Sequence, residues 1–88
     1  MAVTKNTRPL VLVEWRDAVG GNKAGWRQLD DMVPRTDIVQ SVGWLIHKDR
    51  KIVTVVPHLS GTQGDGELSV PRAWIQKLVV LKETSEAP

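Results

Sequence analysis

The chain has 88 residues, 41% of them hydrophobic and 25% charged, with 12 Lys and Arg against 10 Asp and Glu. This length allows a single domain, and the apolar content is that of a globular protein rather than a disordered one. The sequence holds no cysteine, which excludes disulfides, thiolate metal sites and thiol nucleophiles. No apolar run approaches the roughly 18 residues of a membrane helix. We therefore expect a small cytoplasmic protein with no membrane association and no cofactor.

The positive charge is concentrated in the part of the chain that we expect to fold. Residues 1–82 carry 12 positive and 8 negative side chains, because Glu83 and Glu86 belong to a polar C-terminal stretch. We expect a flexible N-terminus over residues 1–8, one domain over residues 9–82 and a disordered tail over residues 83–88. The surplus of positive charge favours an anionic ligand, although a solubilising surface explains it more simply.

Five short segments have the alternation and the residue types of β-strands. Val, Ile, Leu and Trp recur along them, and Gly, Pro, Asn and Asp separate them. The predicted strands cover residues 10–16, 38–47, 52–56, 67–70 and 75–82. In the first strand, Val11, Val13 and Trp15 share one face, and Trp15, like Trp44 of the second strand, is interpreted as a core residue. Gly43 interrupts the second strand and predicts a bend there.

Two segments predict single helical turns. Residues 71–74 (PRAW) are too short for an α-helix and indicate a 3₁₀ turn before the last strand. Within residues 25–32, Trp26, Leu29 and Met32 recur three apart, which favours one helical turn inside the long first connection. The predicted fold is all-β: a small barrel of five antiparallel strands, with a long first loop and a 3₁₀ turn before the last strand.

The stretch ELSVPRAWIQKLVVL, which gives strand, one turn and strand, resembles the SH3-like and Sm-like small β-barrels. The resemblance is one of pattern over residues 9–82 and includes no diagnostic motif. It implies a five-stranded barrel, assembly into a homo-oligomer and an anionic ligand such as RNA. The stretch VGWLIHKDRKIVTVVPHLSG is also similar to small uncharacterised proteins of phages and prophages. That similarity supplies no functional residues, but it implies a location in the host cytoplasm.

The sequence contains no recognisable catalytic motif. It has no phosphate loop, dinucleotide fingerprint, nucleophile elbow or zinc-protease motif. Its two histidines, His47 and His58, fall at the two ends of a predicted hairpin strand, about 20 Å apart, which is too far to share a metal ion within one chain. We therefore predict a protein that is not an enzyme and that has no metal site.

Two long connections, residues 17–37 and 58–66, carry the candidate ligand site, because loops of this length tend to be functional. In a simple antiparallel meander, the loops after the first and third strands lie at the same end of the sheet. That end would gather cations, an aromatic ring and hydroxyls, which together bind phosphate. The basic group at the other end, Lys48, Arg50 and Lys51, is interpreted as a solvated hairpin tip. The candidate ligand-binding residues are Lys23, Trp26, Arg27, Arg35, His58, Ser60, Thr62 and Gln63.

A second candidate surface follows from strands that are apolar on both faces, namely residues 52–56 (IVTVV) and 78–81 (LVVL). A barrel strand buries only one face in its own chain, so a second subunit would cover the other. The tight turn before the last strand is also a common contact site. The candidate interface residues are Val53, Val55, Arg72, Trp74, Val79 and Leu81.

Three functions compete on these observations. The first is a non-enzymatic, oligomeric module that binds a nucleotide or nucleic acid; a phage protein that sequesters a host signalling nucleotide is one version of it. The second is a structural or protein-interaction domain without a small-molecule ligand, such as a phage assembly or accessory protein. The third is an aromatic cage for a cation, built from Trp26, Trp44 and Asp30 or Asp31, which the positive net charge disfavours.

Overall fold

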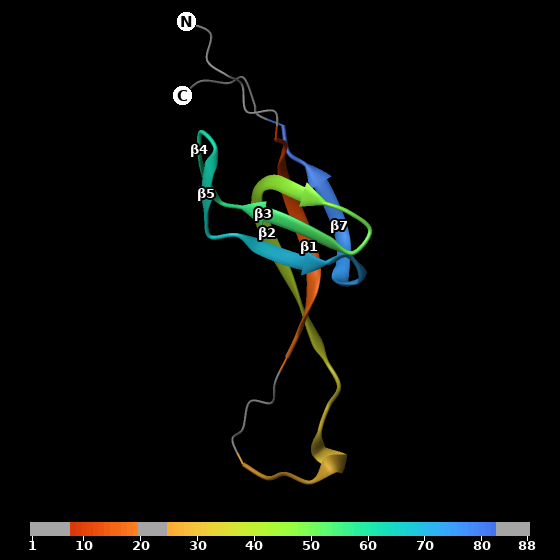
Figure 1. The fold of residues 1–88 in the computed structure, drawn as a ribbon. Coiled ribbons are helices and arrows are strands. Elements are labelled where there is room, and N and C mark those ends of the chain that lie inside the picture. Colours follow the sequence, from red (N-terminus) through yellow and green to blue (C-terminus); the bar gives the residue numbers. More distant parts are fainter. Residues whose placement is uncertain (1–7, 20–24, 83–88) are drawn as a thin grey trace, which may run out of the picture.

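A computed structural model describes residues 8–19 and 25–82 of the chain. The fold is all-β, with five antiparallel strands in one curled sheet of order β6-β3-β2-β1-β7 (Figure 1). These strands are β1 (Leu10–Ala18), β2 (Thr36–Lys48), β3 (Ile52–Val56), β6 (Leu68–Pro71) and β7 (Ile75–Val80). The all-β class and all five predicted strands are therefore confirmed.

The predicted 3₁₀ turn is also confirmed, as η2 (Arg72–Trp74), and the helical turn predicted within residues 25–32 forms only as η1 (Leu29–Asp31). The Gly-rich segment after β3, which was expected to be a loop, contains two further strands. These strands, β4 (His58–Ser60) and β5 (Gln63–Asp65), pair with each other in a small separate sheet. No helix in the described residues is long and apolar enough to cross a membrane.

The sheet curls without closing into the predicted barrel. Its two edges, β6 and β7, do not pair with each other in the part of the chain that the structure describes. The reason lies at the end of β6, where Pro71 offers no N–H to a neighbouring strand and the chain turns directly into η2. β7 then pairs with β1 instead.

The core occupies the inner, concave face of the curl. Its fully buried centre is Val11 and Val13 of β1 and Val53 and Val55 of β3. Larger side chains, partly buried, pack around this centre: Trp15, Leu45, Leu68, Ile75 and Leu78. The face of β1 that carries Trp15 is therefore the core face. Most of the central positions are valines, which suit the tight curvature of a small sheet.

β3 is buried on both of its faces within one chain. Val53 and Val55 point into the core, whereas Val56 lies on the outer face, beneath the β4–β5 hairpin. A Cβ atom added at Gly64 of the hairpin would lie 3.4 Å from both Val56 methyl carbons. The interface predicted at Val53 and Val55 is therefore wrong, because the chain covers these side chains itself.

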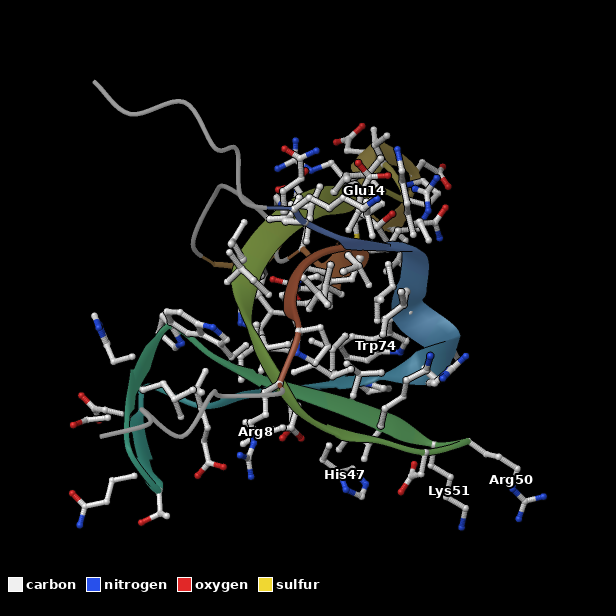
Figure 2. All side chains as sticks on the ribbon, turned by 90° about the horizontal axis from the view of Figure 1, so that it is seen from above. Arg8, Glu14, His47, Arg50, Lys51 and Trp74 are labelled. Atoms are coloured by element: carbon white, nitrogen blue, oxygen red, sulfur yellow. The ribbon has the colours of Figure 1, made fainter. Side chains whose placement is uncertain are left out.

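β2 serves two neighbours by pairing with each along a different part of its length. Residues 36–44 pair with β1, and residues 44–48 pair with β3. The two pairings meet next to Gly43, where the sequence predicts a bend, and Figure 2 shows β2 curving strongly around the body of the molecule. β3 is consequently displaced along β2 relative to β1.

One part of the fold projects from the curled sheet. β7 pairs with β1 only as far as Trp15, so the ends of β1 and β2 continue as a two-stranded ribbon. This ribbon carries η1 and the extended segments on either side of it (Figure 1). We call residues 16–19 and 25–38 the arm. The flexible N-terminus and the disordered tail that the sequence predicts lie outside the described residues, apart from Arg8.

Candidate functional site

The structure divides the predicted ligand-binding residues into two separate groups. Trp26, Arg27 and Arg35 lie in the arm, and Lys23 lies outside the described residues. The other four, His58, Ser60, Thr62 and Gln63, belong to the β4–β5 hairpin and its turn. The arm and this hairpin lie at opposite ends of the molecule (Figure 1). The single loop cluster that the sequence predicts is therefore not formed within one chain.

The strand register explains this separation. The end of β3, Val56, pairs with Trp44, and Trp44 pairs with Leu10 at the start of β1. The arm begins toward the other end of β1, at Arg16, six residues further along, or about 20 Å at about 3.3 Å per residue. β1 and β3 do run in the same direction, as in a meander. Their offset nevertheless moves the two loops apart.

Three of the four hairpin residues line a cavity of about 430 Å³, which we call the hairpin cavity. Its lining includes the predicted His58, Ser60 and Gln63, together with the half-buried indole of Trp44. Among the described residues that line it, the acidic side chain is Asp65, and neither Lys nor Arg is present. A carboxylate without a compensating cation disfavours a phosphate at this position.

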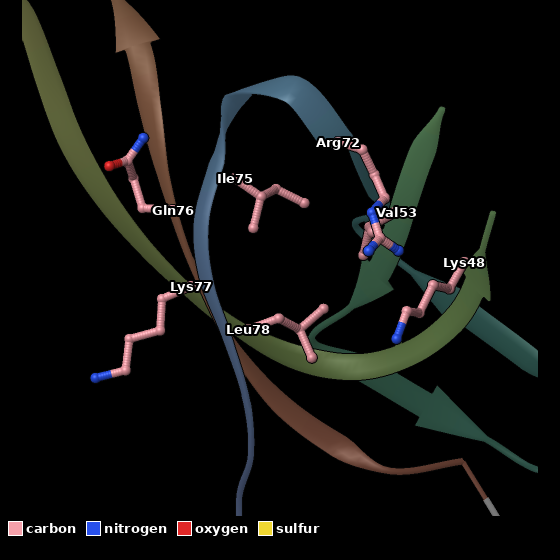
Figure 3. Close-up of a pocket in the computed structure, with 7 residues that line it drawn as sticks. All are labelled: Lys48, Val53, Arg72, Ile75, Gln76, Lys77 and Leu78. Atoms are coloured by element: carbon pink, nitrogen blue, oxygen red, sulfur yellow. The ribbon is translucent and has the colours of Figure 1, made fainter. Parts of the chain in front are cut away.

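The basic side chains converge elsewhere, at a cavity of about 250 Å³ on the open side of the curl, which we call the cationic cavity. Figure 3 shows Lys48 of β2 and Arg72 of η2 extending toward one another beside Val53, Ile75 and Leu78. Gln76 and Lys77 also line this cavity, but Figure 3 shows the Lys77 side chain directed away from Lys48 and Arg72. Two cations therefore lie over an apolar floor.

Local hydrogen bonds hold Arg72 in place next to Lys48. Lys48 ends β2 just before the β2–β3 turn, and Arg72 is tied to that turn by two bonds. The backbone N–H of Arg72 donates to the carbonyl of Lys51 (2.9 Å), and its guanidinium Nη1 donates to the carbonyl of Asp49 (3.4 Å). A second concavity, next to the first, is lined by Lys48, Asp49, Arg50 and Arg72.

Asp49 is the acidic residue of this cluster, and the turn occupies both of its oxygens. Oδ1 accepts the backbone N–H groups of Lys51 (2.7 Å) and Ile52 (2.8 Å), while Oδ2 lies 2.8 Å from Nε2 of His47. The hydrogen bond to His47 and those from the two amides lower the pKa of Asp49 from 3.8 to about 2. The carboxylate therefore stabilises the turn that presents the cations.

Sequence reasoning missed this site. Lys48 was interpreted as part of a solvated tip, and Arg72 as an interface residue. The two positions are 24 residues apart in the sequence, and only the pairing of β3 with β6, in which Ile52 faces Pro71, makes them neighbours. The predicted 3₁₀ turn could have indicated this site, because a turn that joins the two edge strands of a curled sheet lies at one end of the sheet, next to the turn between its inner strands.

The remaining predicted interface residues fall into two places. Trp74 packs against Trp15 with ring centroids 6.4 Å apart and planes inclined by 16°, so part of its surface is already used within the chain. Val79 is half-buried on the outer face of the sheet, because it faces Leu12 of β1. Leu81 is also half-buried, and its N–H donates to the carbonyl of Leu10.

The most exposed large apolar side chains belong to the arm. Trp26 is fully exposed, Leu29 is 80% exposed and Val33 is 79% exposed. Trp26 therefore does not pack the arm against the sheet. It also cannot form an aromatic cage with Trp44, because Trp44 lies beside the β4–β5 hairpin, at the end of the molecule opposite the arm. Comparison of the chain with family models, curated proteins and solved structures finds no match.

Proposed function

We propose that the protein is a non-enzymatic, oligomeric binding module for a phosphate-bearing ligand, a nucleotide or a nucleic acid, held at the cationic cavity. The observation that carries this proposal is the convergence of Lys48 and Arg72 over an apolar floor. A guanidinium binds two phosphate oxygens through parallel hydrogen bonds, and an ammonium adds a mobile positive charge. The apolar floor suits the carbon skeleton of the same ligand.

The surroundings of the cavity support an anionic ligand. Arg50 and Lys51 are exposed in the adjoining turn, and Figure 2 places both at the edge of the molecule. Their charges raise the local concentration of anions and accelerate their approach. Asp49 opposes this effect, but both of its oxygens already accept hydrogen bonds within the turn.

The size of the cavity favours a compact ligand. Its volume of about 250 Å³ is just below the usual range of small-molecule sites, roughly 300–1,000 Å³. An extended single strand binds instead along a basic groove with several stacking aromatic rings. The resemblance to Sm-like proteins favours an oligomer and RNA, and the similarity to phage proteins favours a role in the host cytoplasm. Sequestration of a host signalling nucleotide is one version of this function, in which the phosphate group would occupy the cavity.

The experiment is a calorimetric titration of the protein with mononucleotides, cyclic dinucleotides and a short single-stranded RNA. We expect at least one phosphate-bearing compound to bind, with an affinity that falls as the salt concentration rises. Replacement of both cations, Lys48→Gln with Arg72→Gln, should weaken binding by about tenfold or more, because hydrogen bonds to a charged group are lost. The relative affinities of nucleotide and RNA distinguish the two ligand classes.

Lys77→Gln is the matched control, because Lys77 carries the same charge and lines the same cavity but points away from the two cations. It should change the affinity by less than about threefold. Thermal unfolding of the double variant checks that the loss of the Arg72–Asp49 hydrogen bond has not unfolded the turn. Equal affinity in the double variant and the wild-type protein would contradict the proposed site.

A structural or protein-interaction domain is the second candidate, and the exposure of Trp26, Leu29 and Val33 favours it. These two functions make different predictions in the same titration. If no phosphate-bearing compound binds while the protein forms a defined oligomer, the second function is favoured.

A further inference from the structure

The outer face of the sheet carries apolar side chains that nothing in the described chain covers completely. Directly opposed residues of antiparallel strands share a face, which places Leu10, Leu12, Val42 and Val79 together on the outer face. Val42 is 51% exposed, and the other three are half-buried. We call these four residues the outer patch. A contiguous apolar patch on a folded domain commonly marks a contact surface.

A second apolar region lies at the far end of the same ribbon. It consists of Trp26, Leu29 and Val33 of the arm, which contact solvent over nearly all of their surface. Ile38, on the same face as the outer patch, is also exposed and lies between the two regions. In the part of the chain that the structure describes, this tryptophan and these two aliphatic side chains bury little of their surface, which makes them available for contact with a second copy.

Between the two apolar regions lies a short polar band of opposite charges. Glu14 and Arg16 are two residues apart in β1, so they lie on the same outer face. Within the chain each is hydrogen-bonded to a neutral side chain across the ribbon: Gln40 donates to Glu14 (3.2 Å), and Arg16 donates to Thr36 (3.1 Å). Along β1 the outer face therefore carries the outer patch, Glu14 and Arg16 in that order, and the exposed apolar residues of the arm lie beyond them; Lys77 of β7 faces Glu14 on the same surface.

This order is complementary to its own reverse. If two ribbons lie antiparallel across a two-fold axis near Trp15, Glu14 of each copy faces Arg16 of the other. The outer patch of each copy then faces the arm of the other. Such a contact is isologous, uses the same residues twice and closes as a dimer.

We propose that the outer patch and the arm form a two-fold interface between two copies of this chain, with the arms crossing antiparallel at Glu14 and Arg16. The inference rests on the oligomeric part of the proposed function and supplies its interface. It leaves the cationic cavity open, because Figure 2 shows Glu14 on the side of the molecule opposite Arg50 and Lys51. Assembly and ligand binding can therefore be tested separately.

The first test is sedimentation velocity of the wild-type protein and of a charge-exchange series over roughly 1–200 μM. The wild type should be dimeric at the upper end of this range. Glu14→Lys brings like charges together at both symmetric positions, as does Arg16→Glu, so each single variant should dissociate at least about tenfold more readily. The double variant, Glu14→Lys with Arg16→Glu, restores both pairs and should recover most of the affinity.

If these residues acted only within their own chain, the double variant would not recover. Within the chain Glu14 faces Lys77, so a second substitution at Arg16 would not compensate for Glu14→Lys. Thermal unfolding below the dimer's dissociation constant checks that each single variant is folded. A monomeric wild type at 200 μM would overturn the proposal. So would a double variant that dissociates as readily as the single variants.

The absence of cysteine from the sequence permits a second, geometric test. Gln40 faces Glu14 on the outer face, one residue from the level of the proposed axis, so two Gln40→Cys thiols are too far apart for a disulfide but within reach of a short bifunctional thiol reagent. With this reagent the variant should form a covalent dimer, whereas Lys51→Cys at the β2–β3 turn should remain monomeric. Equal cross-linking of the two variants would contradict the proposed axis.

The third test separates this inference from the proposed function. Trp26→Ser with Leu29→Ser should convert the dimer to a monomer and leave phosphate binding at the cationic cavity within about threefold of the wild type. The double variant Lys48→Gln with Arg72→Gln should remain dimeric and lose phosphate binding at the cationic cavity. An arm variant that remains fully dimeric would overturn the interface, whatever the outcome of the binding experiment.

Discussion

At the scale of single residues, Asp49 organises the turn between β2 and β3. One carboxylate accepts two backbone N–H groups and binds His47, and it closes the turn from which Lys48 and Arg50 project. This geometry is a side-chain mimic of a backbone turn, for which aspartate is well suited. The basic residues of the turn therefore depend on an acidic one for their position.

The pH dependence of stability should report this role. Because folding lowers the pKa of Asp49 from 3.8 to about 2, its ionised form stabilises the fold above about pH 4, and this contribution disappears as the pH falls toward 2. We expect Asp49→Asn to have a lower Tm than the wild type at pH 7. The difference should close between pH 4 and pH 2 in thermal unfolding experiments.

Asp30→Asn, in the exposed η1 turn of the arm, is the control and should unfold like the wild type at pH 7. A Tm difference between Asp49→Asn and the wild type that stays constant down to pH 2 would show that the charge of Asp49 does not stabilise the turn.

At the scale of elements, β2 organises the sheet. It pairs with β1 through its first part and with β3 through its last part, and Gly43 lies next to the change of partner. A Cβ atom at Gly43 would lie 2.7 Å from the carbonyl oxygen of Val56 and 3.2 Å from the Cβ of Val55. The requirement for glycine is therefore a close approach between two backbones.

We expect Gly43→Ala to lower the free energy of unfolding by about 2 kcal/mol or more, because the added methyl group can be accommodated only by shifting the backbone of β3. Urea denaturation measures this difference. Gly64→Ala is the comparison: its Cβ would meet atoms at 3.3–3.4 Å, so we expect a smaller loss. Equal losses in the two variants would indicate that the packing of β2 on β3 is not the cause.

At the scale of the whole molecule, the curled sheet and the arm have separate tasks. All the buried valines of the core belong to β1, β3 and β6, outside the arm. The arm adds a two-stranded ribbon, which is at best marginally stable without a covering layer. Stability thus comes from the curled sheet, and the arm provides surface.

Removal of the arm should separate these two tasks. Ala18 and Thr36 face each other in the register, so an Asn-Gly turn can replace residues 19–35. We expect the shortened protein to keep its strand signal in circular dichroism. Below the dimer's dissociation constant, we expect its stability to lie within about 1 kcal/mol of the wild type. At high concentration it should be monomeric in sedimentation; loss of the fold would show that the arm belongs to the core structure.

Reasoning from the sequence alone predicted the five strands, the 3₁₀ turn before the last of them and the place of Trp15 in the core. These features depend on local rules. Alternation places Val11, Val13 and Trp15 on one face of β1. Proline has no N–H to donate to a neighbouring strand, so Pro71 favours the end of a strand. The all-β class follows from the same rules. The same rules did not predict β4 and β5, because three-residue strands in a Gly-rich segment have too few side chains to show an alternating pattern.

The position of the candidate site, in contrast, depends on how the strands pair in three dimensions. The offset between β1 and β3 depends on how Thr36–Lys48 is shared between two partners, a non-local choice that no pattern within one strand encodes. That offset separates Trp26 from His58 and breaks up the predicted loop cluster. The pairing of β3 with β6 brings Arg72 to Lys48 for the same reason. The strand character of a segment depends on its own residues, but the register between strands depends on the packing of the whole sheet.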